Sequence, residues 1–96
     1  MEIKWLRKAL QNFDQELEYI AQDNPQAARL VAQRIVQAVA LLAENPMLGH
    51  AGRIPGTCEL VIPKTRYIAP YRVRPRLQRI EILRLFHTSC KLPERW

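Results

Sequence analysis

The feature that most restricts the fold of this chain is an alternation of β-forming and basic residues in its last third. Residues 67–74 read YIAPYRVR, and residues 79–87 read RIEILRLFH. Side chains two residues apart on a strand share one face of a sheet, so Arg72 and Arg74 are expected to lie on the same face. We therefore predict a sheet that presents a row of guanidinium groups to solvent.

Basic charge is concentrated in the second half of the 96-residue chain. Residues 1–48 hold five Lys or Arg and six Asp or Glu, whereas residues 49–96 hold ten and three, which gives the net charge of +6. Such asymmetry indicates an anionic partner, namely nucleic acid, an acidic protein or an anionic membrane. A solvated basic surface that only aids solubility is the alternative. Among the partners we expect nucleic acid or an acidic protein.

Composition and length indicate one folded domain over residues 1–96. The chain is 48% hydrophobic and 25% charged, which is typical of a globular protein with one modest core. Its apolar runs are shorter than the roughly 20 residues of a membrane span. Residues 1–5 read MEIKW and lack the apolar core of a signal peptide. We expect a cytoplasmic protein with no membrane partner.

The cysteines and histidines do not have the spacing of a metal site. Cys58 and Cys90 are far apart, as are His50 and His87. Two cysteines also do not make a disulfide framework. We expect reduced thiols, no metal and no cofactor.

Two amphipathic helices are predicted ahead of the basic segments. Apolar residues recur at steps of three and four over residues 6–22 and again over residues 25–44. Asn24 and Pro25 mark the boundary, because asparagine caps a helix and proline fits the first helical position. So short a connection predicts an antiparallel helical hairpin.

Strands are predicted at residues 1–5, 57–62, 66–74 and 79–87, with a loop over residues 46–56. Short connections between the last three strands predict an antiparallel meander. A bulge or an exposed register is expected at Pro70, because proline has no N–H to donate. The predicted fold is α+β, with an N-terminal strand and a helical hairpin packed on one face of a small antiparallel β-sheet.

Short words distributed along the chain match a known plan in order and spacing. They are YIA at 19–21, NP at 24–25, AA at 27–28, NP at 45–46, GR at 52–53, PG at 55–56, ELV at 59–61, YRV at 71–73 and EILRLFH at 81–87. Together with the predicted elements, they resemble the RelE/ParE superfamily of toxins from type II toxin–antitoxin systems. The resemblance spans nearly the whole chain and does not depend on one diagnostic motif.

The resemblance implies a toxic activity and a protein partner. RelE-like members cleave messenger RNA in the ribosomal decoding site, whereas ParE-like members poison DNA gyrase and have no known chemistry of their own. Both are held inactive by a co-encoded antitoxin, usually acidic and partly disordered when free, which also suits a basic sheet because opposite charges steer association.

Three functions follow as hypotheses. The leading one is inhibition of translation by ribosome-dependent mRNA cleavage, with the chain acting as a metal-independent endoribonuclease on the ribosome. The second is DNA gyrase inhibition without catalysis. The third is a non-toxic basic module that binds nucleic acid.

Cleavage of the RelE type needs proton transfer and stabilisation of phosphate charge. His87 is the candidate acid or base, because imidazole titrates near neutral pH. Arg66 and Arg84 are candidates to bind and polarise the phosphate, since guanidinium forks match its oxygens. The candidates for binding nucleic acid or a partner are Lys64, Tyr67, Arg72, Arg74 and Lys91. Tyr67 is included because an aromatic ring can stack on a base.

Each candidate also has a structural interpretation. His87 can cap the end of its strand, and Tyr67 can belong to the core. Arg84 can be a structural arginine paired to Glu59 or Glu81.

The chain also departs from the RelE pattern. RelE-type enzymes carry an arginine three residues before the tyrosine of the third strand. In this chain Tyr71 is that tyrosine, and Ile68 occupies the position of the arginine. Regular pleating puts Arg84 and His87 on opposite faces, so they converge only at a bulge or a strand end.

Overall fold

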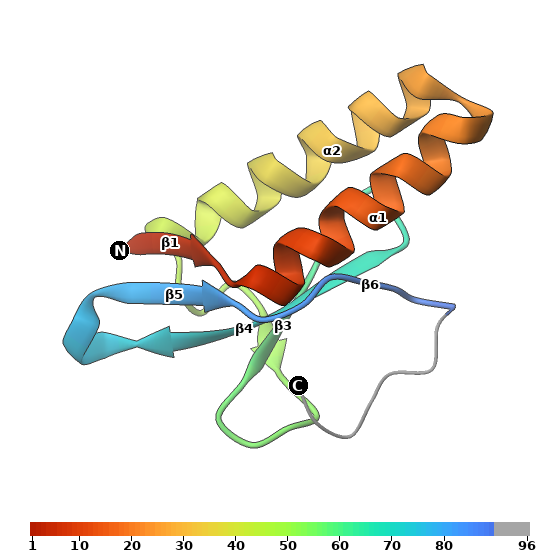
Figure 1. The fold of residues 1–96 in the computed structure, drawn as a ribbon. Helices are drawn as coiled ribbons and strands as arrows, with labels where there is room; N and C mark the ends of the chain where they lie inside the picture. Colours follow the sequence, from red (N-terminus) through yellow and green to blue (C-terminus); the bar gives the residue numbers. More distant parts are fainter. Residues whose placement is uncertain (90–96) are drawn as a thin grey trace.

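A helical hairpin covers one face of a six-stranded sheet in the computed structural model, which describes residues 1–89 (Figure 1). The elements in chain order are β1 (Glu2–Trp5), α1 (Arg7–Asp23), α2 (Pro25–Ala40), the 3-10 helix η1 (Leu41–Ala43), β2 (His50–Ala51), β3 (Cys58–Val61), β4 (Tyr67–Arg74), the 3-10 helix η2 (Pro75–Leu77), β5 (Arg79–Ile82) and β6 (Phe86–His87). The predicted α+β fold is confirmed. No helix within the described residues has the length and apolar character to cross a bilayer.

The turn between the helices is built as its sequence predicts. The backbone N–H of Asn24 donates to Ile20 O at 2.8 Å and closes α1, while its side-chain Oδ1 accepts from the N–H of Ala27 at 3.1 Å and opens α2. Pro25 occupies the first turn of α2, where a missing N–H removes no helical bond. The second helix is shorter than expected, because the chain tightens into η1 from Leu41 onward.

Replacing Asn24 with alanine is expected to lower the free energy of unfolding by about 1 kcal/mol, because the N–H of Ala27 then loses its acceptor. Urea unfolding followed by circular dichroism measures this difference. Gln26→Ala is the control, since Gln26 is an exposed residue of the same turn. Equal midpoints for the two variants would contradict the capping role.

The core lies between the hairpin and the sheet, and strand alternation decides which side chains enter it. Tyr71 of β4 and Ile80 and Ile82 of β5 are fully buried, and they meet Ile35 and Val39 of α2 in one cluster. The residues between them in sequence point to the opposite face of the sheet. We call that opposite side, which the hairpin does not cover, the open face.

The sheet is mixed, whereas the sequence predicted an antiparallel one. The strand order is β1-β5-β4-β3-β2, with β6 also paired to β4. β1 runs parallel to β5, with Ile3 opposite Ile80, and the other pairs are antiparallel. Apolar alternation determines which face of β1 is buried but not which way the strand runs, so the parallel pairing could not be predicted.

The predicted last strand is broken into β5 and β6 by residues 83–85. The break lies beside Pro70, whose carbonyl accepts from Leu83 N at 2.8 Å, although its own nitrogen has no hydrogen to donate. Asn12 of α1 accepts from Leu85 N at 3.2 Å and so satisfies a backbone group within the break. β4 itself runs through Pro70 without a break and Pro70 is fully buried, so the exposed register is not found. The irregularity lies in the strand opposite Pro70, where it ends the regular pleating between Arg84 and His87.

Candidate functional site

Four charged side chains of β4 and β5 converge on the open face. Glu81 Oε1 accepts from Arg72 Nε at 2.7 Å and from Arg74 Nε at 3.2 Å, while Arg79 Nη1 lies 3.5 Å from Glu81 Oε2. The strand register explains the contact, because Arg72 pairs with Glu81 and Arg74 pairs with Arg79 across the ladder. We call these four residues the Glu81 cluster.

The cluster holds a carboxylate in a nearly buried position. The Glu81 side chain is 8% exposed, and its hydrogen bond from Arg72 is the main cause that lowers the pKa of this carboxyl. Burial acts in the opposite direction, and the bond from Arg74 adds to the lowering. Glu81 is therefore ionised at neutral pH, and three guanidinium groups surround one carboxylate.

This arrangement modifies the predicted row of guanidinium groups. Arg72 and Arg74 do lie on the open face, but both are tied to Glu81 and are not free in solvent. Their side chains remain 38% and 47% exposed. The face is therefore less positive than its arginine count indicates, and its guanidinium groups have fixed orientations.

A separate groove of about 550 Å³ lies on the helix-covered side, where β6 and the start of β4 meet α1 and α2. We call it the His87 groove. Its lining residues are Glu16, Tyr19, Ile20, Val31, Thr65, Arg66, Tyr67, His87 and Ser89.

His87 is held within this groove by its own chain. Its Nδ1 accepts from the backbone N–H of Ser89 at 3.1 Å and lies 2.6 Å from Ser89 Oγ. Its ring meets the ring of Tyr67 edge-on, with 5.2 Å between centroids. Only Nε2 is left without a hydrogen bond to Ser89, which is the arrangement of a histidine that caps a strand end.

The candidate catalytic residues are only partly brought together. His87 and Arg66 line the same groove, whereas Arg84 does not. Arg84 Nη1 donates instead to the carbonyl of Leu83 within the break, and burial lowers the pKa of its guanidinium. Glu59 and Glu81, the partners considered for Arg84, are contacted by other basic side chains.

The candidate binding residues have separate locations. Tyr67 is 5% exposed and its hydroxyl donates to Glu16 Oε1 at 3.0 Å, so this ring belongs to the core and is not available to stack on a base. Lys64 is exposed in the turn before β4, where its carbonyl accepts from Arg34 Nη1. Lys91 lies outside the described residues.

A family model described as the ParE toxin of the type II toxin–antitoxin system parDE matches residues 3–91. This chain belongs to the ParE toxin family. It is 41% identical over 92 residues to protein Y4kP of Sinorhizobium fredii (strain NBRC 101917 / NGR234), which is named as a candidate toxin. That match covers 96% of this chain and 93% of Y4kP.

A solved structure supports the same membership. The chain resembles one from the chromosomal ParDE toxin–antitoxin system of P. aeruginosa with a TM-score of 0.78 and 31% sequence identity. The match covers 91% of this chain and 95% of that one. The predicted RelE/ParE resemblance is thus confirmed, and the chain is a ParE-like toxin of a type II toxin–antitoxin system.

This ParE-family toxin also has a second buried carboxylate that was not predicted as part of a site. Glu59 of β3 accepts from the backbone N–H of Arg53 at 3.0 Å, and His50 Nε2 lies 3.7 Å from its other oxygen. Arg79 and Glu81 were likewise missed as site residues. Both alternate with apolar residues in the same way as Arg72. A four-residue turn after Arg74 would place them opposite Arg72 and Arg74 on the same face of the sheet.

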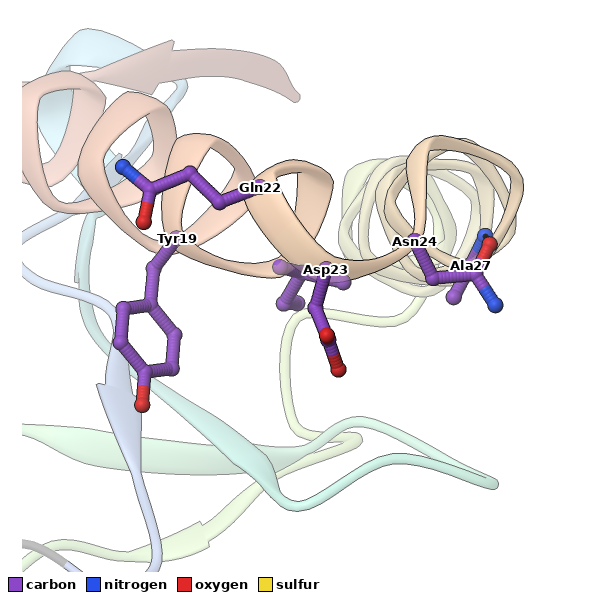
Figure 2. Close-up of a pocket in the computed structure, with 6 residues that line it drawn as sticks. Tyr19, Gln22, Asp23, Asn24 and Ala27 are labelled. Atoms are coloured by element: carbon purple, nitrogen blue, oxygen red, sulfur yellow. Dashed lines mark hydrogen bonds between the residues drawn. The ribbon is translucent and has the colours of Figure 1, made fainter.

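A further hollow of about 600 Å³ lies at the closed end of the helical hairpin of this ParE-family toxin (Figure 2). Tyr19 projects from α1 on one side of it, and Asp23 and Asn24 form the turn (Figure 2). Its lining has no cationic side chain and no imidazole, so it is unsuited to bind an anion. Among residues 1–89, no three His, Cys, Asp or Glu side chains gather as metal ligands.

Proposed function

We propose that this ParE-family chain is a toxin that acts by binding DNA gyrase, without chemistry of its own, and that a cognate antitoxin neutralises it. The family match supports the ParE-like alternative over the mRNA cleavage that we first expected. The observation that carries the proposal is the separation of the candidate catalytic residues. Arg84 donates to the backbone of the β5–β6 break and is not among the residues that line the groove with His87 and Arg66.

The state of His87 supports the same proposal. Cleavage of RNA requires an acid or base free to exchange a proton with the substrate, together with cations at the phosphate. Here Nδ1 accepts from the N–H of Ser89 and the neighbouring ring of Tyr67 is buried, so any proton transfer to a substrate would have to pass through Nε2. The contact with Ser89 is one that a structural histidine at the end of a strand also makes.

The antitoxin partner is proposed from the ParDE neighbour and from charge. The chain carries a net charge of +6, and an acidic antitoxin that is partly disordered when free would be steered toward it.

Controlled expression with labelled precursors tests the proposed target. Loss of thymidine incorporation with an SOS response, while methionine incorporation continues, is expected. Prompt loss of methionine incorporation ahead of any change in DNA synthesis would contradict it. Co-expression of the small protein encoded beside the toxin gene is expected to restore growth.

Ribosome-dependent mRNA cleavage remains the second candidate function, because one observation favours it. Glu16, Arg66 and His87 line one groove, which places a carboxylate, a guanidinium and an imidazole along the same surface. In this function His87 and Arg66 would take the roles of acid or base and of phosphate ligand.

Replacing His87 with alanine separates the two candidates. Toxicity of the soluble variant is expected to be unchanged, because a binding toxin needs no proton transfer from the imidazole. His50→Ala is the matched control, since His50 is the other histidine and lies in β2 at the far edge of the sheet. A fall in toxicity of about 100-fold or more for His87→Ala alone would show catalysis by this residue and overturn the proposal.

A further inference from the structure

We propose that the Glu81 cluster, together with Lys4 and Arg76, is a binding site for the backbone phosphates of duplex DNA. The proposal adds a nucleic-acid ligand to a protein whose proposed target is another protein. It concerns the open face, whereas the His87 groove lies on the helix-covered side.

The first support is the orientation of the donors in the cluster. Arg72 and Arg74 both reach Glu81 Oε1 through Nε. Their outer Nη groups make no further hydrogen bond among residues 1–89, and both side chains are substantially exposed. Glu81 therefore binds each of the two guanidinium groups through its Nε. The outer Nη groups, which match phosphate oxygens, are left directed away from the carboxylate.

The second support is a surplus of positive charge. Three guanidinium groups surround the single carboxylate of Glu81. Arg79 Nε is buried and has no hydrogen-bond acceptor among the described residues, and its ion pair with Glu2 Oε1 is long, at 4.0 Å. An additional anion over the cluster would compensate this charge.

The third support is the continuation of the basic surface on both sides. Lys4 of β1 pairs with Glu81 in the ladder and is exposed, while the exposed Arg76 lies in η2 at the tip of the β4–β5 hairpin. Arg72 and Arg74 are two residues apart and so advance by about 6.6 Å along the strand. That advance is similar to the separation of successive phosphates in one nucleic-acid strand.

The lining favours duplex DNA over single-stranded RNA or an acidic peptide. Single-stranded RNA is bound by stacking on aromatic rings. Close to the cluster, within the described residues, Trp5 packs on Phe13 and Tyr71 is fully buried, so neither ring is presented on the open face. A peptide interface would also need apolar or aromatic anchors at its centre, and the exposed apolar side chain beside the site, Leu77, lies in η2 at the tip of the β4–β5 hairpin. Guanidinium and ammonium groups are typical of contacts to a duplex backbone.

The test is a fluorescence anisotropy titration of a labelled duplex of about 20 base pairs with the purified full chain at several salt concentrations. Binding that weakens with salt, with a slope of about −2 to −4, is expected for two to four neutralised phosphates. Arg74→Gln should weaken binding and reduce the slope by about 0.9. Arg29→Gln should change neither, because Arg29 is an exposed arginine of α2 and the charge change is the same.

A charge-conserving variant keeps the test informative if the glutamine variant does not fold. Arg72→Lys with Arg74→Lys retains both charges but loses the planar forks that Glu81 orients, and a roughly fivefold weaker complex is expected. Equal losses of duplex affinity in the Arg29→Gln and Arg74→Gln variants would show that only the overall charge of the protein matters, and would overturn the proposed site. Absence of duplex binding at low salt, or tighter binding of single-stranded RNA or polyglutamate, would overturn it as well.

Discussion

Replacing Glu81 with glutamine is expected to lower the free energy of unfolding by about 2 to 3 kcal/mol. The variant keeps the shape of the side chain but removes the negative charge that Arg72, Arg74 and Arg79 share. Three guanidinium groups then repel one another without a carboxylate between them. Because the arginines are partly exposed, water recovers some of the loss, which keeps the effect below that of a fully buried pair. Thermal unfolding should show a decrease of roughly 10 °C.

The pH dependence gives an independent measure of the same contact. The pKa of Glu81 is lowered in the folded state, so its stabilisation is complete above the unfolded value of about 4.3 and disappears as pH falls through the folded value. The difference between wild type and Glu81→Gln should therefore shrink below pH 4. Glu18→Gln makes the same charge change at an exposed site on α1 and should stay close to wild type. A Glu81→Gln variant as stable as this control would contradict the role of the cluster.

Replacing Gly49 with alanine is expected to lower the free energy of unfolding by about 2 to 3 kcal/mol. An added Cβ would lie 2.7 Å from Glu59 O and 2.7 Å from Tyr71 Cε1, both of which belong to the sheet and cannot move freely. The hydroxyl of Tyr71 donates to Pro46 O at 2.7 Å and accepts from Gly49 N at 3.0 Å, which fastens this loop to β4. Burial raises the pKa of the Tyr71 phenol, so it stays protonated as a donor.

Urea unfolding of Gly49→Ala, Tyr71→Phe and the double variant measures this contact. Tyr71→Phe alone should lower stability by about 1 to 2 kcal/mol, because two hydrogen bonds are lost. The double variant should be more stable than the sum of the single losses indicates, since removing the hydroxyl relieves one of the close approaches. Gly56→Ala is the control, because nothing lies near its added Cβ and only its positive φ of 82° is strained. Strict additivity, or an unchanged midpoint for Gly49→Ala, would contradict the packing.

The helical hairpin could be predicted because each of its signals is local. The apolar spacing defines the stripes, and Asn24 and Pro25 end one helix and begin the next. The faces of β4 were also predictable, since alternation alone places Tyr71 in the core and Arg72 on the open face. These features depend on residues within a few positions of one another.

Pairing between distant segments could not be predicted in the same way. The parallel direction of β1 leaves its apolar alternation unchanged, and β2 is only two residues long, too short to show a pattern. Contact between Arg72 and Glu81 depends on the pairing register of the β4–β5 hairpin, which follows from the turn at residues 75–78. The sequence therefore indicated the arginines of the open face but not the carboxylate that orients them.

The surroundings of the candidate catalytic residue His87 could not be predicted for the same reason. His87 and Arg84 were expected on opposite faces unless the strand was interrupted, and the break at residues 83–85 removes that simple rule. Ser89 as the partner of His87 depends on the turn that follows β6. The catalytic roles of His87, Arg66 and Arg84 remain predictions that the toxicity of variants has to test.

Two purified systems distinguish a toxin that binds DNA gyrase from one that cleaves messenger RNA. The chain is added to a supercoiling reaction of DNA gyrase on relaxed plasmid and, at the same concentration, to a cell-free translation reaction. We expect supercoiling to stop or cleaved plasmid to accumulate, while protein synthesis proceeds with intact messenger RNA. Cut messenger RNA and arrested synthesis, with supercoiling unaffected, would contradict it.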